Sequence, residues 1–211
     1  MSGRFVVLEG IEGVGKTTQM AIAGAHLRAR CSELVVTREP GGTPLAERIR
    51  ELVLAPGAER LSASAELALM FAARAVHLET LIKPALARNA WVLCDRFTDA
   101  SYAYQGAGRG LGAEPVAALE RLVQGTLQPD LVVVLDAPVE VALGRMRARR
   151  GAADRFESER SEFFERARRC YLERAKAAPA RYAVLDASGD VEAVGAVLCR
   201  ALDAAIAGWG G

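Results

Sequence analysis

Five short apolar runs recur along the chain, and a stretch with helical periodicity follows each one. The runs are Phe5–Leu8, Leu34–Thr37, Trp91–Cys94, Leu131–Leu135 and Tyr182–Leu185. Continuous apolar runs of this length are typical of strands that are buried on both faces. Strands that alternate with helices form parallel sheets. The pattern therefore predicts an α/β fold, with a five-stranded parallel sheet covered by helices on both faces.

The intervening segments carry the signals that begin, bend and end helices. After a first helix that follows Thr17, helices are expected over Pro44–Leu54, from Ser62 or Ser64 to Arg88, and over Asp99–Gln105, Pro115–Gln124, Pro138–Arg149, Glu157–Ala177 and Val191–Ile206. Either serine can cap the long third helix. Pro84 is expected to bend or divide that helix, because proline has no backbone N–H.

Composition narrows the classes of protein that fit this fold. A chain of 211 residues is expected to form a single domain over 1–211. The net charge of +1 argues against a dedicated nucleic-acid binder. The four cysteines include no Cys-x-x-Cys pair, which argues against zinc and dithiol redox sites. Without a secretory signal or an uncharged apolar stretch of about 18 residues, we expect a cytoplasmic protein that binds no membrane.

The first apolar run leads into Gly-Ile-Glu-Gly-Val-Gly-Lys-Thr at Gly10–Thr17, which has the spacing of a P-loop. A glycine-rich turn that arose by chance is the alternative, and the strand before it and the helix after it disfavour that reading. Glycines let backbone N–H groups close on phosphate oxygens. Lys16 is expected to bridge the β- and γ-phosphates of ATP, and Thr17 to bind Mg²⁺. The predicted ATP site comprises Gly10, Ile11, Glu12, Gly13, Val14, Gly15, Lys16, Thr17 and Thr18.

Polar motifs follow four of the predicted strands at the point where each strand ends. They are Gly10–Thr17, Arg38–Thr43, Asp95–Phe97 and Asp136–Pro138. Ligands of parallel α/β sheets bind beyond the carboxyl ends of the strands. We therefore expect the four motifs to converge at one edge of a sheet of the P-loop NTPase type.

Taken together, the motifs resemble those of bacterial thymidylate kinases over essentially the whole chain. The resemblance is carried by Gly-Ile-Glu-Gly-Val-Gly-Lys-Thr-Thr, by Arg-Glu-Pro-Gly-Gly-Thr, and by Asp-Arg-Phe followed by Ser-Tyr-Ala-Tyr-Gln. It implies transfer of the ATP γ-phosphoryl group to dTMP, which gives dTDP for dTTP synthesis. It also implies Mg²⁺ as the cofactor and a homodimer as the assembly.

Phosphoryl transfer to a phosphate requires positioning and charge neutralisation more than covalent chemistry. The second pKa of a phosphate monoester is about 6, so the acceptor is already an anion and needs no general base. Arg38 and Arg96 follow strands and are candidates for the acceptor phosphate, with surface ion pairs as the alternative. Asp95 resembles an acidic Mg²⁺ ligand, or is a helix N-cap. By resemblance, Glu12 accepts a hydrogen bond from the sugar 3′-OH; a solvated loop carboxylate is the alternative.

By resemblance, residues on two predicted helices bind thymine and disfavour ribose. Phe71 and Arg74 are three residues apart, so both leave the same helix face, where Phe71 can stack on a pyrimidine and Arg74 can donate to its carbonyl. Ser101 and Gln105 are four apart and can complete the polar contacts. Tyr102 is expected to crowd the sugar 2′ position. Plain core packing of Phe71 and surface exposure of Arg74 are the alternatives.

A cluster of arginines lies between two predicted helices, at Arg145, Arg147, Arg149, Arg150 and Arg155. By resemblance, a lid at about 147–158 closes over ATP and supplies the basic residue that the P-loop lacks. Arg149 and Arg155 are then catalytic, together with Lys16 and Arg96, while Arg145 stacks on adenine. A solvated helix end and a nucleic-acid patch are the alternatives.

The segment Leu61–Leu86 carries more apolar positions than one buried stripe requires, so we expect a two-fold dimer along this helix. His26 and His77 have no metal-ligand partners at useful spacing, and we interpret both as structural or surface residues. A kinase with another acceptor and a P-loop switch or ATPase are the competing functions. The chain has no Asn-Lys-x-Asp guanine signature.

Overall fold

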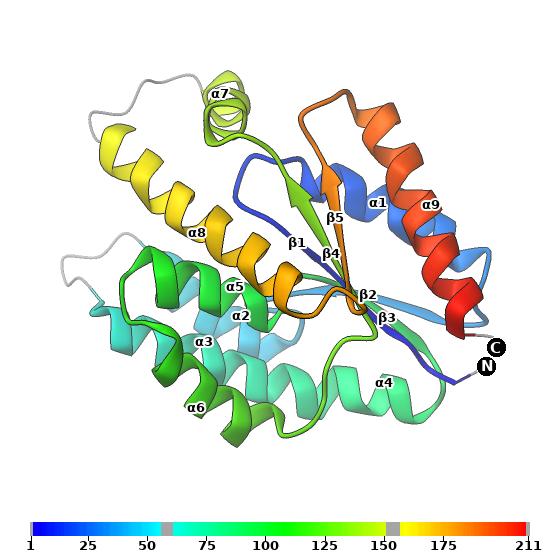
Figure 1. The fold of residues 1–211 in the computed structure, drawn as a ribbon. Helices are drawn as coiled ribbons and strands as arrows, with labels where there is room; N and C mark the ends of the chain where they lie inside the picture. Colours follow the sequence, from blue (N-terminus) through cyan, green and yellow to red (C-terminus); the bar gives the residue numbers. More distant parts are fainter. Residues whose placement is uncertain (1, 56–60, 151–156, 210–211) are drawn as a thin grey trace.

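The computed structural model describes residues 2–55, 61–150 and 157–209, without the side chains of 149–150 and 157–159. Within these ranges, five strands form one sheet: β1 (Phe5–Glu9), β2 (Leu34–Arg38), β3 (Trp91–Asp95), β4 (Leu131–Asp136) and β5 (Tyr182–Asp186). All pairs are parallel, and the order is β2-β3-β1-β4-β5 (Figure 1). The predicted five-stranded parallel sheet is confirmed.

Helices cover both faces of this sheet. They are α1 (Lys16–Arg28), α2 (Pro44–Leu54), α3 (Ala63–His77), α4 (Lys83–Ala87), α5 (Thr98–Ser101), α6 (Ala113–Gln124), α7 (Val139–Arg150), α8 (Glu157–Ala177) and α9 (Val191–Trp209), with π-helical turns η1 (Leu78–Ile82) and η2 (Tyr102–Gly108). Helices α1 and α9 pack together on one face, and α4 and α8 lie on the other (Figure 1). No helix in the described ranges is long and apolar enough to cross a membrane.

Burial along the strands follows from their places in the sheet. The three central strands β1, β3 and β4 are buried almost throughout, and they have the most continuous apolar runs. The outer strands β2 and β5 expose alternate residues, including Val36 and Val184. Trp91 at the start of β3 is 3% exposed and packs edge-on against Trp209, with ring centroids 5.5 Å apart. The sheet therefore forms the core around which the loops are held.

The long helix predicted before β3 is divided, as expected. Ser62 is the cap, and its hydroxyl accepts a hydrogen bond from the Ala65 N–H at 3.2 Å. The division comes at η1, just before Pro84, which stands in the first turn of α4. Proline cannot donate to the carbonyl four residues earlier, and the wider π-helical turn directly precedes it. Helix α6 begins two residues earlier than predicted, and α9 extends three residues further.

The strand register brings three of the predicted motifs to one level. Asp95 at the end of β3 pairs with Leu8 of β1 on one side and with Arg38 of β2 on the other. The P-loop, the Arg38–Thr43 turn and the Asp95–Phe97 segment therefore leave the sheet at the same edge.

Candidate active site

A cavity of about 690 Å³ lies at this edge, a size typical of small-molecule sites. It is bounded by the P-loop, the turn after β2, helices α2 and α3, and the segment after β3. The sequence-predicted residues that line it are Glu12, Gly13, Gly15, Lys16, Thr17, Thr18, Arg74, Asp95, Arg96, Ser101 and Gln105. The structure thus brings most of the predicted site into one space.

The P-loop has the backbone conformation that its glycines permit. Gly10, Gly13 and Gly15 have φ values of 135°, 91° and 96°. A Cβ on Gly10 would lie 2.4 Å from the Leu135 carbonyl oxygen, so this position also has no room for a side chain. Ile11 and Val14 are buried in the core and can offer a ligand only backbone groups. The loop is therefore built to present N–H groups to phosphate.

Lys16 lies at the first turn of α1, where its ammonium group is turned back onto the loop. Its Nζ donates to the carbonyl oxygens of Gly10 at 2.8 Å and Ile11 at 2.9 Å. Burial, with a smaller contribution from the nearby Arg96 cation, lowers the pKa of Lys16 to about 7. A phosphate in the cavity would favour the charged form again, because an opposite charge raises the pKa of an amine.

The buried carboxyl group of Glu9, which sequence reasoning missed, lies beneath the P-loop. It accepts hydrogen bonds from the Phe97 N–H at 2.7 Å and the Tyr171 hydroxyl at 2.9 Å. Burial raises the pKa of Glu9 to about 8, with a smaller contribution from the Asp99 carboxylate. The only sequence signal for this residue was an acidic side chain at the end of an otherwise apolar strand.

Arg96 has a left-handed backbone, with φ of 70°, a conformation that is uncommon outside glycine. Its guanidinium donates to the Gly10 carbonyl oxygen at 3.1 Å and to the Tyr171 hydroxyl at 3.2 Å. The same group lies over the ring of Tyr104, 4.8 Å from its centroid. Tyr104 also lines the cavity, and sequence reasoning missed it. These contacts fix a permanent positive charge beside the P-loop.

Asp95 and Thr17 were predicted to hold Mg²⁺, and both line the cavity. Oδ1 of Asp95 is buried and has no hydrogen-bond partner among the described residues. Buried polar atoms normally have a partner, and a carboxylate oxygen beside a hydroxyl is the kind of ligand that Mg²⁺ prefers. The two side chains therefore fit a Mg²⁺ ion that is bound together with phosphate.

The structure does not bring Arg38 to the cavity. Its side chain is 54% exposed and forms an ion pair with Glu47 at 2.9 Å. Side chains alternate along a strand, and Thr37 before it points inward, so Arg38 points away. Arg50 on α2 lines the cavity instead and donates to the Pro40 carbonyl oxygen at 2.8 Å. An arginine in mid-helix gave no sequence signal of this role.

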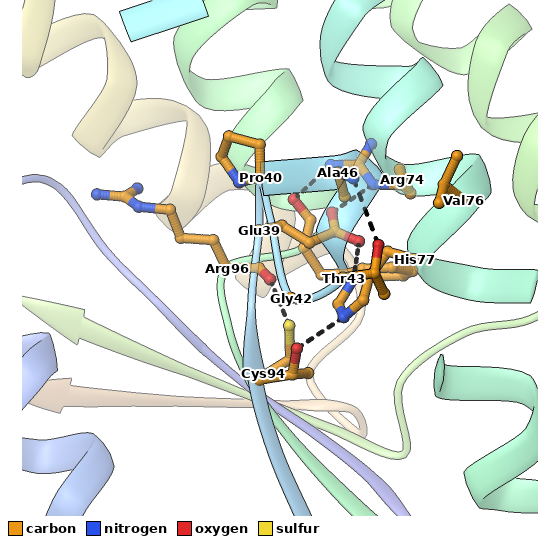
Figure 2. Close-up of polar contacts among 12 residues, drawn as sticks. Glu39, Pro40, Gly42, Thr43, Ala46, Arg74, Val76, His77, Cys94 and Arg96 are labelled. Carbon is orange, nitrogen blue, oxygen red and sulfur yellow. Dashed lines mark hydrogen bonds and ion pairs between the residues drawn. The ribbon is translucent and has the colours of Figure 1, made fainter. Parts of the chain in front are cut away.

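Arg74 on α3 also lines the cavity and is 3% exposed. Its Nε donates to the Glu39 carboxylate at 2.7 Å, as Figure 2 shows. Its Nη2 donates to the Phe97 carbonyl oxygen at 3.0 Å and to the Ser101 hydroxyl at 3.1 Å. Nη1 is buried and has no partner among the described residues. The guanidinium therefore keeps one unused donor for a ligand.

The structure does not bring two of the predicted base-site residues, Phe71 and Tyr102, to the lining of the cavity. Phe71 is 1% exposed and packs with Tyr102 in a small core cluster, while Met70 lines the cavity. Met70 is four residues before Arg74 and Phe71 is three, so both are neighbours of Arg74 on the helix surface, one on each side of it. Sequence spacing alone therefore did not show which of the two faces the cavity. The Tyr102 hydroxyl donates to Glu120 at 2.6 Å, and its ring lies 3.7 Å below Arg174. Tyr102 is therefore held outside the cavity lining.

Gln105 is held by a carboxylate that was not predicted. Its Nε2 donates to Oε1 of Glu66 at 2.8 Å, and the other oxygen of Glu66 pairs with Arg109 at 3.0 Å. A carboxylate only accepts hydrogen bonds, so it fixes which end of the amide faces it. The amide oxygen of Gln105 is left as the acceptor for a ligand.

At the opposite side of the P-loop, Arg145 on α7 is tied to the segment after β5. It donates to the carbonyl oxygens of Ala187 at 2.7 Å, Ser188 at 2.9 Å and Gly189 at 2.9 Å. The predicted lid at 147–158 falls largely outside the described residues, as do Arg155 and the side chain of Arg149.

Comparison with known proteins agrees with this geometry. A sequence model of the family described as thymidylate kinase matches residues 8–197. The chain is 60% identical over 194 residues to a thymidylate kinase of Pseudomonas putida (strain GB-1), with 92% of each chain covered. It is 55% identical over 204 residues to that of Teredinibacter turnerae, covering 97% of this chain and 99% of the relative.

A solved structure extends the likeness to three dimensions. The crystal structure of thymidylate kinase from Ehrlichia chaffeensis superposes with a TM-score of 0.79 at 31% identity, and covers 96% of this chain and 99% of that one. Sheet, P-loop and cavity therefore agree with the sequence matches, and the chain belongs to the thymidylate kinase family.

Proposed function

We propose that this member of the thymidylate kinase family transfers the γ-phosphoryl group of ATP to dTMP in the cavity beside β1. A single observation carries the proposal. One cavity is lined both by the P-loop and by Arg74, a buried arginine with a donor that has no partner among the described residues. The P-loop suits a nucleoside triphosphate, and Arg74 suits the carbonyl edge of a base.

The phosphate groups are assigned to the P-loop. Lys16 and the loop N–H groups hold the β- and γ-phosphates of ATP. Thr17 and Asp95 hold Mg²⁺, which neutralises charge on the transferred group when bound. Arg96 and Arg50 line the same cavity and offset the charge of the acceptor phosphate. This neutralisation is the main requirement of the reaction, because the acceptor is already an anion.

The thymine base is assigned to the side chains around Arg74. Nη1 of Arg74 donates to a carbonyl oxygen, and the Gln105 amide oxygen accepts from the ring N–H beside it. Met70 packs against the ring, in the role that sequence analysis gave to Phe71. Glu12 of the P-loop lines the cavity, and its carboxylate accepts a hydrogen bond from the sugar 3′-OH.

Two further assignments concern the predicted lid and the part of the site that binds adenine. Arg149 and Arg155 stabilise the transferred phosphoryl group from a lid, since the P-loop has no basic residue besides Lys16. Arg145 stacks on adenine beside Ala187–Gly189. Alanine at Arg149 or at Arg155 should lower kcat more than it weakens dTMP binding; unchanged kcat in both would remove the lid from the mechanism.

The base assignment is tested by Arg74→Ala. A lost hydrogen bond to a charged group is worth about 1.5–3 kcal/mol, so KM for dTMP should rise roughly 10- to 150-fold. KM for ATP should change little. Arg88→Ala, which removes an exposed arginine paired with Glu33, is the control for loss of charge alone. Equal losses for dTMP and ATP in Arg74→Ala would overturn the assignment.

A further inference from the structure

Phosphoryl transfer makes no direct use of a buried group of polar side chains behind Arg74. His77, one turn after Arg74 on α3, is 0% exposed, and Glu39 in the turn after β2 is 5% exposed. Nδ1 of His77 lies 3.0 Å from Oε1 of Glu39 (Figure 2). Nε2 of His77 lies 2.7 Å from Oγ1 of Thr37. The other Glu39 oxygen accepts from Nε of Arg74 at 2.7 Å.

The chemistry of these partners fixes the direction of each hydrogen bond. An ionised carboxylate can only accept, so both the Arg74 Nε and the His77 Nδ1 donate to Glu39. In neutral imidazole, Nε2 then has no proton and accepts from the Thr37 hydroxyl. A hydrogen-bonded series of Thr37, His77, Glu39 and Arg74 therefore runs from the end of β2 to the cavity, and each of the three links joins one donor to one acceptor.

The backbone around this hydrogen-bonded series leaves the His77 ring little room to move. Gly42 has φ of 83°, and a Cβ there would lie 2.6 Å from Nε2 of His77 and 2.3 Å from Oγ1 of Thr37. Close packing on one side and two hydrogen bonds along its plane hold the imidazole ring in one orientation. The ring in turn leaves the Glu39 carboxylate one position in which both oxygens are used.

The direction in which the unused Nη1 donor of Arg74 points depends on that position of the Glu39 carboxylate. The guanidinium is planar and rigid, so fixing Nε on Glu39 and Nη2 on Ser101 also fixes Nη1. We propose that His77 is a positioning residue that aims Arg74 at the base by holding Glu39. This inference rests on the proposed function, and it assigns to His77 a part in substrate recognition beyond the structural role expected from sequence.

Two replacements of His77 separate its two hydrogen bonds. The amide nitrogen of asparagine can take the place of Nδ1, so His77→Asn keeps a donor for Glu39 and loses the bond to Thr37. Glutamine reaches the place of Nε2, so His77→Gln keeps the bond to Thr37 and loses the one to Glu39. Asparagine is one methylene group shorter than glutamine, so a loss of packing alone would affect His77→Asn more than His77→Gln. That is the opposite of the order expected from the bond to Glu39, so each variant serves as the control for the other.

His77→Gln should raise KM for dTMP about tenfold, with kcat and KM for ATP within about twofold of the parent. His77→Asn should stay within about threefold in all three constants. Thr37→Val should behave as His77→Asn, because it breaks the same bond from the other side. Thermal unfolding of each variant, followed by circular dichroism, shows whether a fold remains to be assayed.

Equal effects of His77→Asn and His77→Gln on KM for dTMP would overturn the proposal and leave His77 as a packing residue. If either variant does not fold, Glu39→Gln replaces the pair. It should raise KM for dTMP similarly and leave KM for ATP unchanged; a loss shared by both substrates would also overturn the proposal. Failure here with the expected loss in Arg74→Ala refutes only the role of His77, whereas normal dTMP binding in Arg74→Ala refutes the proposed base site.

Discussion

At the scale of single residues, the site is organised by buried charges that lack a complete set of partners. Lys16 donates to backbone carbonyls, Oδ1 of Asp95 accepts nothing among the described residues, and Nη1 of Arg74 donates to nothing there. Burying such groups costs free energy in the empty protein. A ligand that supplies phosphate, a cation and a carbonyl oxygen would satisfy all three.

The lowered pKa of Lys16 predicts proton uptake when ATP binds. With a pKa of about 7 in the empty site, Lys16 is mostly neutral at pH 8. The ATP phosphates raise that pKa, so binding at pH 8 should take up most of one proton at this group, and far less at pH 6. Calorimetric titration in buffers of different ionisation enthalpy measures the uptake, and Lys16→Met should lose this uptake at pH 8. Identical uptake in parent and variant at pH 8 would contradict the argument.

The hydrogen bond from Gln105 to Glu66 predicts how the base is discriminated. In Glu66→Gln the new amide can donate to Gln105, so the Gln105 side chain is free to turn over. Cytosine, which presents an acceptor where thymine presents N–H, should then be tolerated better. The ratio of kcat/KM for dTMP to that for dCMP should fall at least about tenfold. Arg109→Gln removes the other partner of Glu66 and should leave this ratio unchanged; a fall of equal size in both variants would count against the role of Glu66.

Site residues that belong to a recognisable sequence motif were predictable. Site residues that reach the cavity only because of how loops and turns fold were not. Lys16, Thr17 and Asp95 follow strand ends in the sequence, and the structure places them in the cavity. Glu39 and Tyr104 enter it because loops and a π-helical turn aim them there. Sequence spacing carries no information about such turns.

At the scale of elements, the five strands and most helices were predictable because hydrophobic periodicity is set by burial. The errors occur where a short turn decides which face a side chain occupies. Strand alternation turns Arg38 outward after Thr37. The π-helical turn η2, which periodicity alone does not reveal, places Tyr104 in the cavity and leaves Tyr102 against α6 and α8.

The different placements of Arg38 on β2 and Arg50 on α2 can be tested with a pair of alanine variants. Arg50→Ala should raise KM for dTMP roughly 10- to 100-fold, because Arg50 lines the cavity where the acceptor phosphate is assigned. Arg38→Ala should change it less than about threefold, since an exposed ion pair contributes little. Steady-state kinetics with dTMP varied at saturating ATP gives both values. A larger effect from Arg38 than from Arg50 would reverse the assignment.

At the scale of the whole molecule, the sheet order places β1 at the centre and brings the loops after β1, β2 and β3 to one edge. Topology of this kind follows from alternating strands and helices, so the location of the site was predictable. Assembly is a separate matter. Ala68 and Ala72 on α3 are exposed although the helix is rich in apolar residues, and one face of it remains open to a partner.

The predicted two-fold dimer along α3 should be visible in solution. Light scattering at micromolar concentration should give twice the mass of one chain. Ala72→Glu introduces a charge one turn after Ala68 and should shift the protein toward a monomer, with the far-ultraviolet circular dichroism unchanged. A parent protein that is monomeric at this concentration would refute the dimer.

Whether the cavity brings ATP and dTMP together is decided by how ATP consumption depends on the acceptor. Purified protein with ATP and Mg²⁺ is assayed with dTMP, with dCMP or another nucleoside monophosphate, and with no acceptor, and ADP and the nucleoside diphosphate are quantified together. We expect one dTDP for each ADP formed with dTMP, much slower turnover with the other monophosphates, and almost none without an acceptor. ADP formation that is as fast without dTMP as with it, or faster with another monophosphate, would show that dTMP is not the acceptor for which this site is built.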